Sequence, residues 1–273
     1  MNRIQLSVLL AGLCSKAFGG WYECYNFKGA IDKYPITLSF QVRDGFFGEA
    51  DRKNHNVLGT YKYDRVNTPL YLEGSFDRVS KKIRLDEVPM GFPMETANRK
   101  GPATAAFDFS FSRSGSDGQW TDLKTKKVLT LHLDFVSQMI DTVSMYQDST
   151  VKFPAPVEIL MRASTPDKYF VGVYDLDIPK NHYDRAALTS LRIYDKKSNK
   201  LFQEIPFPPQ AGNAMTIVYE NVSTGKNKIG VEFDIGKGGA TVDYIFNAHR
   251  KQYVVSEEGD DLVDGFYGQT GQE

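Results

Sequence analysis

Short segments in which apolar and polar residues alternate dominate this sequence, and they restrict the fold more than any other feature. Between Leu129 and Phe135 every second residue is apolar, and the positions between them hold Thr130, His132 and Asp134. The segment Ile36–Phe40 repeats the pattern. Successive side chains of a β-strand point to opposite faces, so a period of two is typical of a strand with one buried face.

Further segments follow the same rule and alternate with polar turn sequences. We predict strands at Gly59–Tyr63, Leu70–Gly74, Lys82–Asp86, Ala105–Phe111, Phe170–Tyr174, Ser190–Tyr194, Leu201–Ile205, Met215–Tyr219, Ile229–Phe233, Thr241–Phe246 and Gln252–Val255. Strands at intervals of roughly ten residues are typical of sandwiches and barrels. The fold class predicted is therefore all-β, with two antiparallel β domains that are barrel-like or sandwich-like and contain little helix.

Turns and the one candidate helix are predicted from composition. Arg43–Gly45, Ser116–Gly118 and Lys197–Asn199 contain Gly or Asn, which favour tight reversals because they tolerate positive φ. Residues Val136–Tyr146 place Met139, Ile140 and Val143 on one side of a possible short helix.

The first residues resemble an export signal. A cationic residue, Arg3, precedes the apolar run Ile4–Leu13, and the small residues Ala17 and Gly19 follow. We expect residues 1–19 to be a signal peptide and the protein to be periplasmic or secreted; the alternative is a buried N-terminal strand or helix. Two prolines in 152–156 mark a linker between an N-terminal β domain, 20–151, and a C-terminal β domain, 157–273.

Charge and cysteine content narrow the partners. Loss of Arg3 and Lys16 with the signal would change the formal charge from −1 to −3, so no nucleic-acid partner is predicted. No later apolar run is long enough for a membrane span. Cys24 would be the only thiol left, which excludes an internal disulfide and leaves open whether it pairs with another chain or is simply buried.

The sequence contains no recognisable catalytic motif. The four histidines, His55, His132, His182 and His249, lack the spacing of a zinc site, and no Gly-x-Ser-x-Gly motif occurs. We therefore expect a protein that is not an enzyme, although an enzyme with a dispersed site is an alternative.

Two acidic turns were compared with calcium loops. Glu220–Gly225 has Val222 at a position that should supply an oxygen ligand, so we expect an ordinary hairpin turn there. The turn Asp260–Gly265 has more carboxylates, and Asp260 and Asp264 are the candidate metal ligands. The alternative is a solvated acidic turn; no other cofactor is predicted.

Aromatic residues on predicted strands are the candidate ligand-binding residues. Tyr61, Tyr63 and Trp120 would line a cleft for a sugar or another small ligand, or else fill a β-domain core.

The sequence pattern of the C-terminal half resembles that of a known group of proteins. Tyr169–Tyr174, followed by Leu191–Ile205, resembles exported bacterial β proteins that include a periplasmic immunity protein of type IV secretion systems, which inhibits a lysozyme-like toxin. The resemblance implies a non-catalytic inhibitor with a calcium-binding acidic loop, but Glu220–Gly225 departs from the group's D-x-N-x-D-G pattern.

The N-terminal half resembles an uncharacterised bacterial β-meander pattern. Its marks are Gly59–Tyr63, Pro69–Gly74, Ile83–Glu87 and Gly118–Trp120. Together these observations predict an exported, non-catalytic protein that binds a protein partner, a muramidase being the candidate that the resemblance suggests. The alternative is a module that binds a glycan or small ligand.

Overall fold

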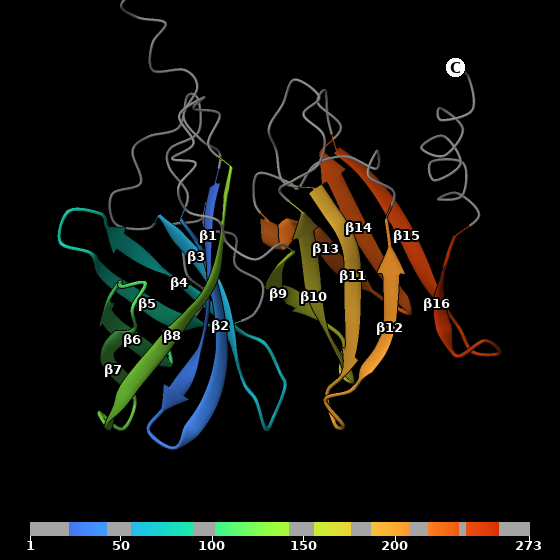
Figure 1. Cartoon of the computed structure of the whole chain (residues 1–273). Helices are drawn as coiled ribbons and strands as arrows, with labels where there is room; N and C mark the ends of the chain where they lie inside the picture. Colours follow the sequence, from blue (N-terminus) through green and yellow to red (C-terminus); the bar gives the residue numbers. More distant parts are fainter. Residues whose placement is uncertain are drawn as a thin grey trace, which may run out of the picture.

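The computed structural model describes residues 22–42, 56–89, 102–141, 156–175, 187–207, 218–234 and 239–256. These residues form a closed eight-stranded barrel followed by two four-stranded antiparallel sheets (Figure 1). Their only helical element is one short 3-10 turn. The predicted all-β fold class is confirmed.

The barrel is a meander that closes on itself. Its strands are β1 (Tyr22–Ile31), β2 (Tyr34–Val42), β3 (Val57–Tyr63), β4 (Leu70–Asp77), β5 (Lys82–Val88), β6 (Ala105–Ser110), β7 (Ser116–Asp122) and β8 (Val128–Asp141). Phe27 of β1 lies opposite Leu38 on β2 and opposite Phe135 on β8, so the first strand pairs with both the second and the last. Closure leaves the barrel without an unpaired edge.

Aromatic side chains fill the barrel interior. Phe27 stacks on Phe40 with ring centroids 5.6 Å apart, and its edge contacts include Phe109, Phe111 and Phe135. These residues belong to one buried cluster with the inward-facing leucines and isoleucines of the other strands. The alternation that identified the strands is thus the alternation of inside and outside of the barrel.

Two glycines allow barrel strands to approach closely. A Cβ on Gly29 would lie 2.0 Å from the carbonyl oxygen of His132, and one on Gly74 would lie 1.9 Å from that of Arg84. A side chain at either position would clash with the neighbouring strand, so both glycines are required where the sheet bends.

The second half forms two facing sheets. The first contains β9 (Val157–Ser164), β10 (Lys168–Asp175), β11 (Ala187–Asp195) and β12 (Leu201–Pro206); the second contains β13 (Val222–Gly225), β14 (Lys228–Asp234), β15 (Gly239–Asn247) and β16 (Gln252–Val255), after the 3-10 turn η2 (Val218–Glu220). Inward side chains of both sheets, among them Phe170, Leu191, Val231 and Val242, share one buried cluster. This sandwich lies beside the barrel (Figure 1).

Most predicted strands are present, but the predicted helix is wrong. Residues 136–141 continue β8, and Gln138, Met139 and Ile140 lie opposite Tyr25, Cys24 and Glu23 on β1. Residues 142–146 lie outside the described part of the chain. Hydrogen bonds to β1 therefore outweigh the apolar spacing that suggested a helix, and the β-branched residues Val136 and Ile140 fit a strand well.

Three further local predictions are wrong. Val218 and Tyr219, predicted as strand, belong to the 3-10 turn. The hairpin predicted around Glu220–Gly225 exists, but Val222–Gly225 is its first strand and the reversal follows at Lys226 and Asn227. Ser116–Gly118, predicted as a turn, opens β7, and the reversal lies earlier, at Gly115 with φ +125°. Asn227 in the first turn and Gly115 in the second have positive φ, and these residues, not the clusters of polar residues, fix the position of the reversal.

The expected signal peptide, residues 1–19, lies outside the described residues, as does the predicted linker 152–156 except for Pro156. The division into domains stays a prediction, although the barrel ends at Asp141 and the first strand of the sandwich begins at Val157. In the described ranges, no helix has the length and apolar character needed to cross a membrane.

Candidate functional site

The barrel and the sandwich share a buried core. Three residues on the outer face of the barrel, Cys24, Leu58 and Met139, belong to the same apolar cluster as the interior of the sandwich. Each is at most 2% exposed. The thiol of Cys24 is buried in this cluster and packs as a small apolar side chain, consistent with the second of the two roles expected for it.

Polar side chains on the same outer face bind the backbone of the sandwich. Leu160 of β9 donates its backbone N–H to the Ser39 hydroxyl at 3.3 Å, and Val218 donates its own to Gln41 Oε1 at 3.0 Å. Ser39 and Gln41 are both buried. These bonds and the shared core fix β9 against the barrel. The space next to this contact between β9 and the barrel therefore has a defined shape.

That space is a pocket of about 470 Å³, which we call the cleft. One wall is the outer face of the barrel at β1, β2, β3 and β8, and the other is the outer face of the sheet β9–β12. The lining residues are Asn26, Phe27, Lys28, Thr37, Ser39, Lys62, Asp64, Val136, Ser137, Pro156, Glu158, Leu160, Tyr169, Val171, Tyr194 and Asn199.

The barrel wall of the cleft is a connected polar surface. Asn26 donates to the Ser137 hydroxyl at 3.0 Å and accepts a bond from Ser39 at 2.7 Å. On β3, Lys62 donates to Asp64 at 2.9 Å and to Asn67 at 2.8 Å. The side chain of Lys62 is buried, so both partners are needed to hold its charge.

The sheet wall presents a stack of two tyrosines. Tyr169 of β10 and Tyr194 of β11 are direct cross-strand neighbours, with ring centroids 5.1 Å apart and planes 11° from parallel. The ammonium of Lys62 lies 5.0 Å from the centroid of the Tyr169 ring, a cation–π contact from the barrel. Burial raises the pKa of both tyrosines, and the hydroxyl of Tyr169 donates to Asn199 Oδ1 at 2.5 Å.

A ladder of charges continues across the outer face of this sheet. Arg192 contacts Glu158 of β9 and, at 3.1 Å, Glu204 of β12. Ser190 donates a second bond to Glu204 at 2.7 Å. These contacts hold the pKa of Glu204 below its usual range, with the Ser190 bond as the largest cause. Glu158 is the member of the ladder that lines the cleft.

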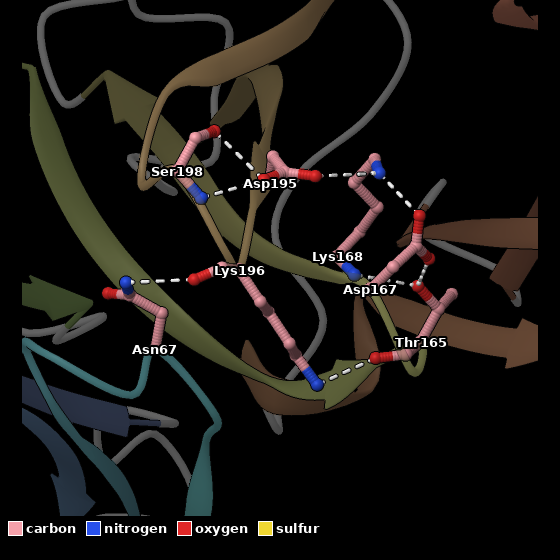
Figure 2. Close-up of polar contacts among 7 residues, drawn as sticks. All are labelled: Asn67, Thr165, Asp167, Lys168, Asp195, Lys196 and Ser198. Atoms are coloured by element: carbon pink, nitrogen blue, oxygen red, sulfur yellow. Dashed lines mark hydrogen bonds and ion pairs between the residues drawn. The ribbon is translucent and has the colours of Figure 1, made fainter.

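Turns from both units meet at the end of the cleft. Figure 2 shows Asn67, from the β3–β4 turn, donating its side-chain amide to the backbone carbonyl of Lys196 at 3.1 Å. The β11–β12 turn is itself fixed by Asp195, which accepts bonds from the backbone and hydroxyl of Ser198, each at 2.8 Å. Lys168 contacts Asp195 at 3.3 Å and also pairs with Asp167. The contact between the turns is thus made between two ordered segments.

The predicted ligand-binding residues lie elsewhere, inside the barrel. Tyr61 is 0% exposed and packs against Phe107 and Tyr63, with centroid distances of 4.9 Å and 5.5 Å. Tyr63 and Trp120 are half-buried members of the same interior cluster. The three residues therefore belong to one cluster, but none of them lines the cleft. Their role in ligand binding stays a prediction.

The carboxylate of Glu87 gives this interior group a polar centre. It accepts hydrogen bonds from the hydroxyls of Tyr61 and Thr104, and burial together with this carboxylate raises the pKa of Tyr61 far above its ordinary value. The buried indole Nε1 of Trp120 has no hydrogen-bond acceptor among the described residues.

No metal centre is formed by the described residues. They contain no group of three or more His, Cys, Asp or Glu side chains arranged to hold an ion. The predicted ligands Asp260 and Asp264 lie outside the described residues. Calcium binding at that turn stays a prediction.

Sequence reasoning missed the residues of the cleft. Asn26 and Ser137 are separated by 111 positions, and Leu160 and Ser39 by 121, although each pair is hydrogen-bonded. The one sequence feature that could have indicated the cleft is the presence of polar residues at the outward positions of strands. That feature is equally typical of a strand face that is simply exposed to solvent, so it does not identify a site.

No protein-family model matches the sequence, and no curated protein shows significant similarity to it.

Proposed function

We propose that this protein is a non-catalytic binding protein and that the cleft between barrel and sandwich binds a small polar ligand, with saccharides as the leading class. The observation that carries the proposal is the composition of the cleft: a tyrosine stack faces a wall of hydroxyl and amide groups. Sugar rings present apolar faces that pack on aromatic rings, and hydroxyls that both donate and accept hydrogen bonds.

The fixed walls of the cleft support this proposal. Hydrogen bonds that Ser39 and Gln41 accept from the backbone of the sandwich, and the shared core at Met139, hold the two walls together without a ligand. A preformed site loses less conformational entropy on binding than one that must be ordered.

The test is binding to a panel of oligosaccharides, measured by calorimetry, with variants that alter only the cleft. Val171→Trp places a large ring on the sheet wall and should abolish binding. Tyr194→Ala removes one ring of the stack and should weaken binding by about tenfold or more, by analogy with nucleobases, whose stacking on one aromatic ring contributes about 1–3 kcal/mol. Thr241→Trp, at an exposed position on β15, is the matched control and should bind as the wild type does.

Binding of saccharides that Val171→Trp does not affect would remove the cleft from the proposal. Absence of binding to every member of the panel would remove the saccharide proposal altogether.

A second candidate function is contact with a protein partner, as in an inhibitor of or immunity protein against a cell-wall hydrolase. An exposed pair of phenylalanines on the sandwich favours it: Phe202 is 36% exposed and Phe246 39%. Exposed apolar residues that gather in one place are typical of protein contacts. Phe202 and Phe246 have ring centroids 6.4 Å apart.

The inhibitor hypothesis is tested by adding the purified protein to a muramidase at stoichiometric concentration. Inhibition that the double variant Phe202→Ser, Phe246→Ser loses would support it; full muramidase activity and no complex would exclude it for that enzyme. Export to the periplasm or outside the cell belongs to the same proposal and rests on the pattern in residues 1–19.

A further inference from the structure

The barrel wall of the cleft contains hydrogen-bond donors that have no acceptor among the described residues. Asn26 and Lys28 are two positions apart on β1, so both face outward. Their cross-strand neighbours are Ser39 and Thr37 on β2, and Asn26 also lies opposite Ser137 on β8. These residues form one continuous polar lattice.

Bonds within the lattice leave two of its donor hydrogens without an acceptor in the described part of the chain. Asn26 Oδ1 accepts from Ser39, and the Ser39 hydroxyl oxygen accepts from the backbone of Leu160. Asn26 Nδ2 donates only one of its two hydrogens, to Ser137 Oγ, and the Ser137 hydroxyl donates to no acceptor among the described residues. One amide hydrogen and one hydroxyl hydrogen are therefore left for a ligand.

Lys28 adds an uncompensated positive charge beside these donors. It is exposed, lines the cleft, and makes no ion pair or hydrogen bond with the residues that the structure describes. Asp134 lies opposite Lys28 in the strand register, but its carboxylate contacts His132 Nε2 at 3.3 Å instead.

The other charged groups of the cleft are already paired. The ammonium of Lys62 is held by Asp64, and the carboxylate of Glu158 contacts Arg192 on the sheet wall. Lys28 is thus the one charged residue of the lining that has no partner among the described residues.

We infer that the ligand of the cleft is an acidic saccharide, whose carboxylate binds Lys28 while its ring packs on Tyr194. A carboxylate offers only acceptors, and bonds from Lys28, Asn26 and Ser137 would satisfy its two oxygens. This inference rests on the proposed saccharide-binding function and adds the chemical group that the site selects.

The experiment compares saccharides that differ in one carboxylate. Calorimetry is carried out with cellobiose and cellobiouronic acid, and with chitobiose and the disaccharide of N-acetylglucosamine and N-acetylmuramic acid. We expect the acidic member of at least one pair to bind about tenfold tighter or better, with an advantage that declines as salt rises because Lys28 is exposed. Lactate, which has the carboxylate without the sugar, should bind far more weakly.

Lys28→Gln shortens the side chain by one bond, keeps a polar end that can donate hydrogen bonds, and removes the charge. It should abolish the preference, so that the acidic and the neutral disaccharide bind with equal affinity. The matched control is Lys82→Gln, an exposed lysine on β5 that does not line the cleft, and it should keep the preference.

The outcomes separate the two proposals. Equal binding of acidic and neutral members, or a preference that survives in Lys28→Gln, overturns the inference and leaves saccharide binding intact. Lactate binding as tightly as the acidic disaccharide overturns the saccharide part. Failure of every sugar to bind overturns both.

Discussion

The side-chain amide of Gln203 makes two hydrogen bonds to the backbone of Tyr253. Its Nε2 donates to the Tyr253 carbonyl at 2.9 Å, and the Tyr253 N–H donates to its Oε1 at 2.8 Å. Gln203 belongs to β12 and Tyr253 to β16, the last strands of the two facing sheets. One side chain thus takes the place of a backbone pairing at the margin where the two sheets meet.

Removal of this amide should loosen the sandwich. Gln203→Ala loses both hydrogen bonds, and at about 0.5–1.5 kcal/mol each the free energy of unfolding should fall by about 1–3 kcal/mol. Urea unfolding measures the change. The control Gln119→Ala, at an exposed position on β7, should change stability by less than about 0.5 kcal/mol.

Gln203→Glu separates the two bonds of the amide. A carboxylate can accept from the Tyr253 N–H but only repels its carbonyl oxygen, so Gln203→Glu should be destabilised at neutral pH and recover in part when acid protonates the side chain. Identical stability of the wild type, Gln203→Ala and Gln203→Glu would show that the two bonds do not hold the sheets together.

Met139 connects the stability of the barrel to that of the sandwich. It is a barrel residue on β8, it is 0% exposed, and its side chain belongs to the core of the sandwich. Met139→Ala leaves a cavity in that core and should lower the free energy of unfolding by about 2–5 kcal/mol. Val128→Ala, at a position 52% exposed on the same strand, is the control.

Because the core is shared, Met139→Ala should shift the unfolding of the whole molecule. Fluorescence of Trp120, which lies with the barrel interior, and far-ultraviolet circular dichroism, which reports the strands of both units, should show coincident transitions. A transition of the barrel that stays at the wild-type position would show that the two units unfold independently.

Asn67 joins the two turns at the end of the cleft and has a left-handed backbone, with φ 59°. Its side chain accepts from Lys62 and donates to the carbonyl of Lys196. Asn67→Gly loses these bonds but tolerates the backbone, whereas Asn67→Ala also pays about 1–2 kcal/mol for the left-handed conformation. Thermal unfolding should therefore rank wild type first, Asn67→Gly second and Asn67→Ala last. Asn67→Ala as stable as Asn67→Gly would contradict this role of the backbone.

The sequence allowed the fold class to be predicted because alternation in a strand reflects burial directly. Ile36, Leu38 and Phe40 all point into the barrel and are fully buried. Alternation fails as a guide at residues 136–141, where a helix is predicted but β8 continues. Here one face of the strand lies toward the barrel interior, and the other face, at Met139, packs into the core of the sandwich. A strand buried on both faces loses the alternation on which its prediction depends.

The cleft could not be predicted from local pattern. Nothing in the local sequence distinguishes Tyr194 or Lys62 from other strand residues. Only the packing of β9 against β2, β3 and β8 brings the sheet that carries Tyr194 close to the barrel strand that carries Lys62. The candidate residues Tyr61 and Trp120 were selected because they are aromatic, but aromatic residues at inward positions serve the barrel core equally well.

Asp195 predicts how the β11–β12 turn responds to acid. Bonds from the backbone and hydroxyl of Ser198, and then the charge of Lys168, hold the pKa of Asp195 at about 2, below its ordinary value. An unfolded aspartate titrates near about 3.9, so the unfolded chain takes up the proton first. The contribution of this carboxylate to stability is therefore present above about pH 4 and is lost as the pH falls toward 2.

Replacement of Asp195 by Asn removes the titrating group while its amide oxygen can still accept from Ser198. The stability difference between the wild type and Asp195→Asn should be largest above about pH 4 and should shrink as the pH approaches 2, because protonated Asp195 also lacks the charge that attracts Lys168. Urea unfolding at a series of pH values measures it. Asp32→Asn, in the β1–β2 turn at φ 52°, is the control, since Asp32 makes no side-chain hydrogen bond to a described residue. A difference for Asp195→Asn that stays constant between pH 5 and 2 would mean that the charge of Asp195 does not stabilise the turn.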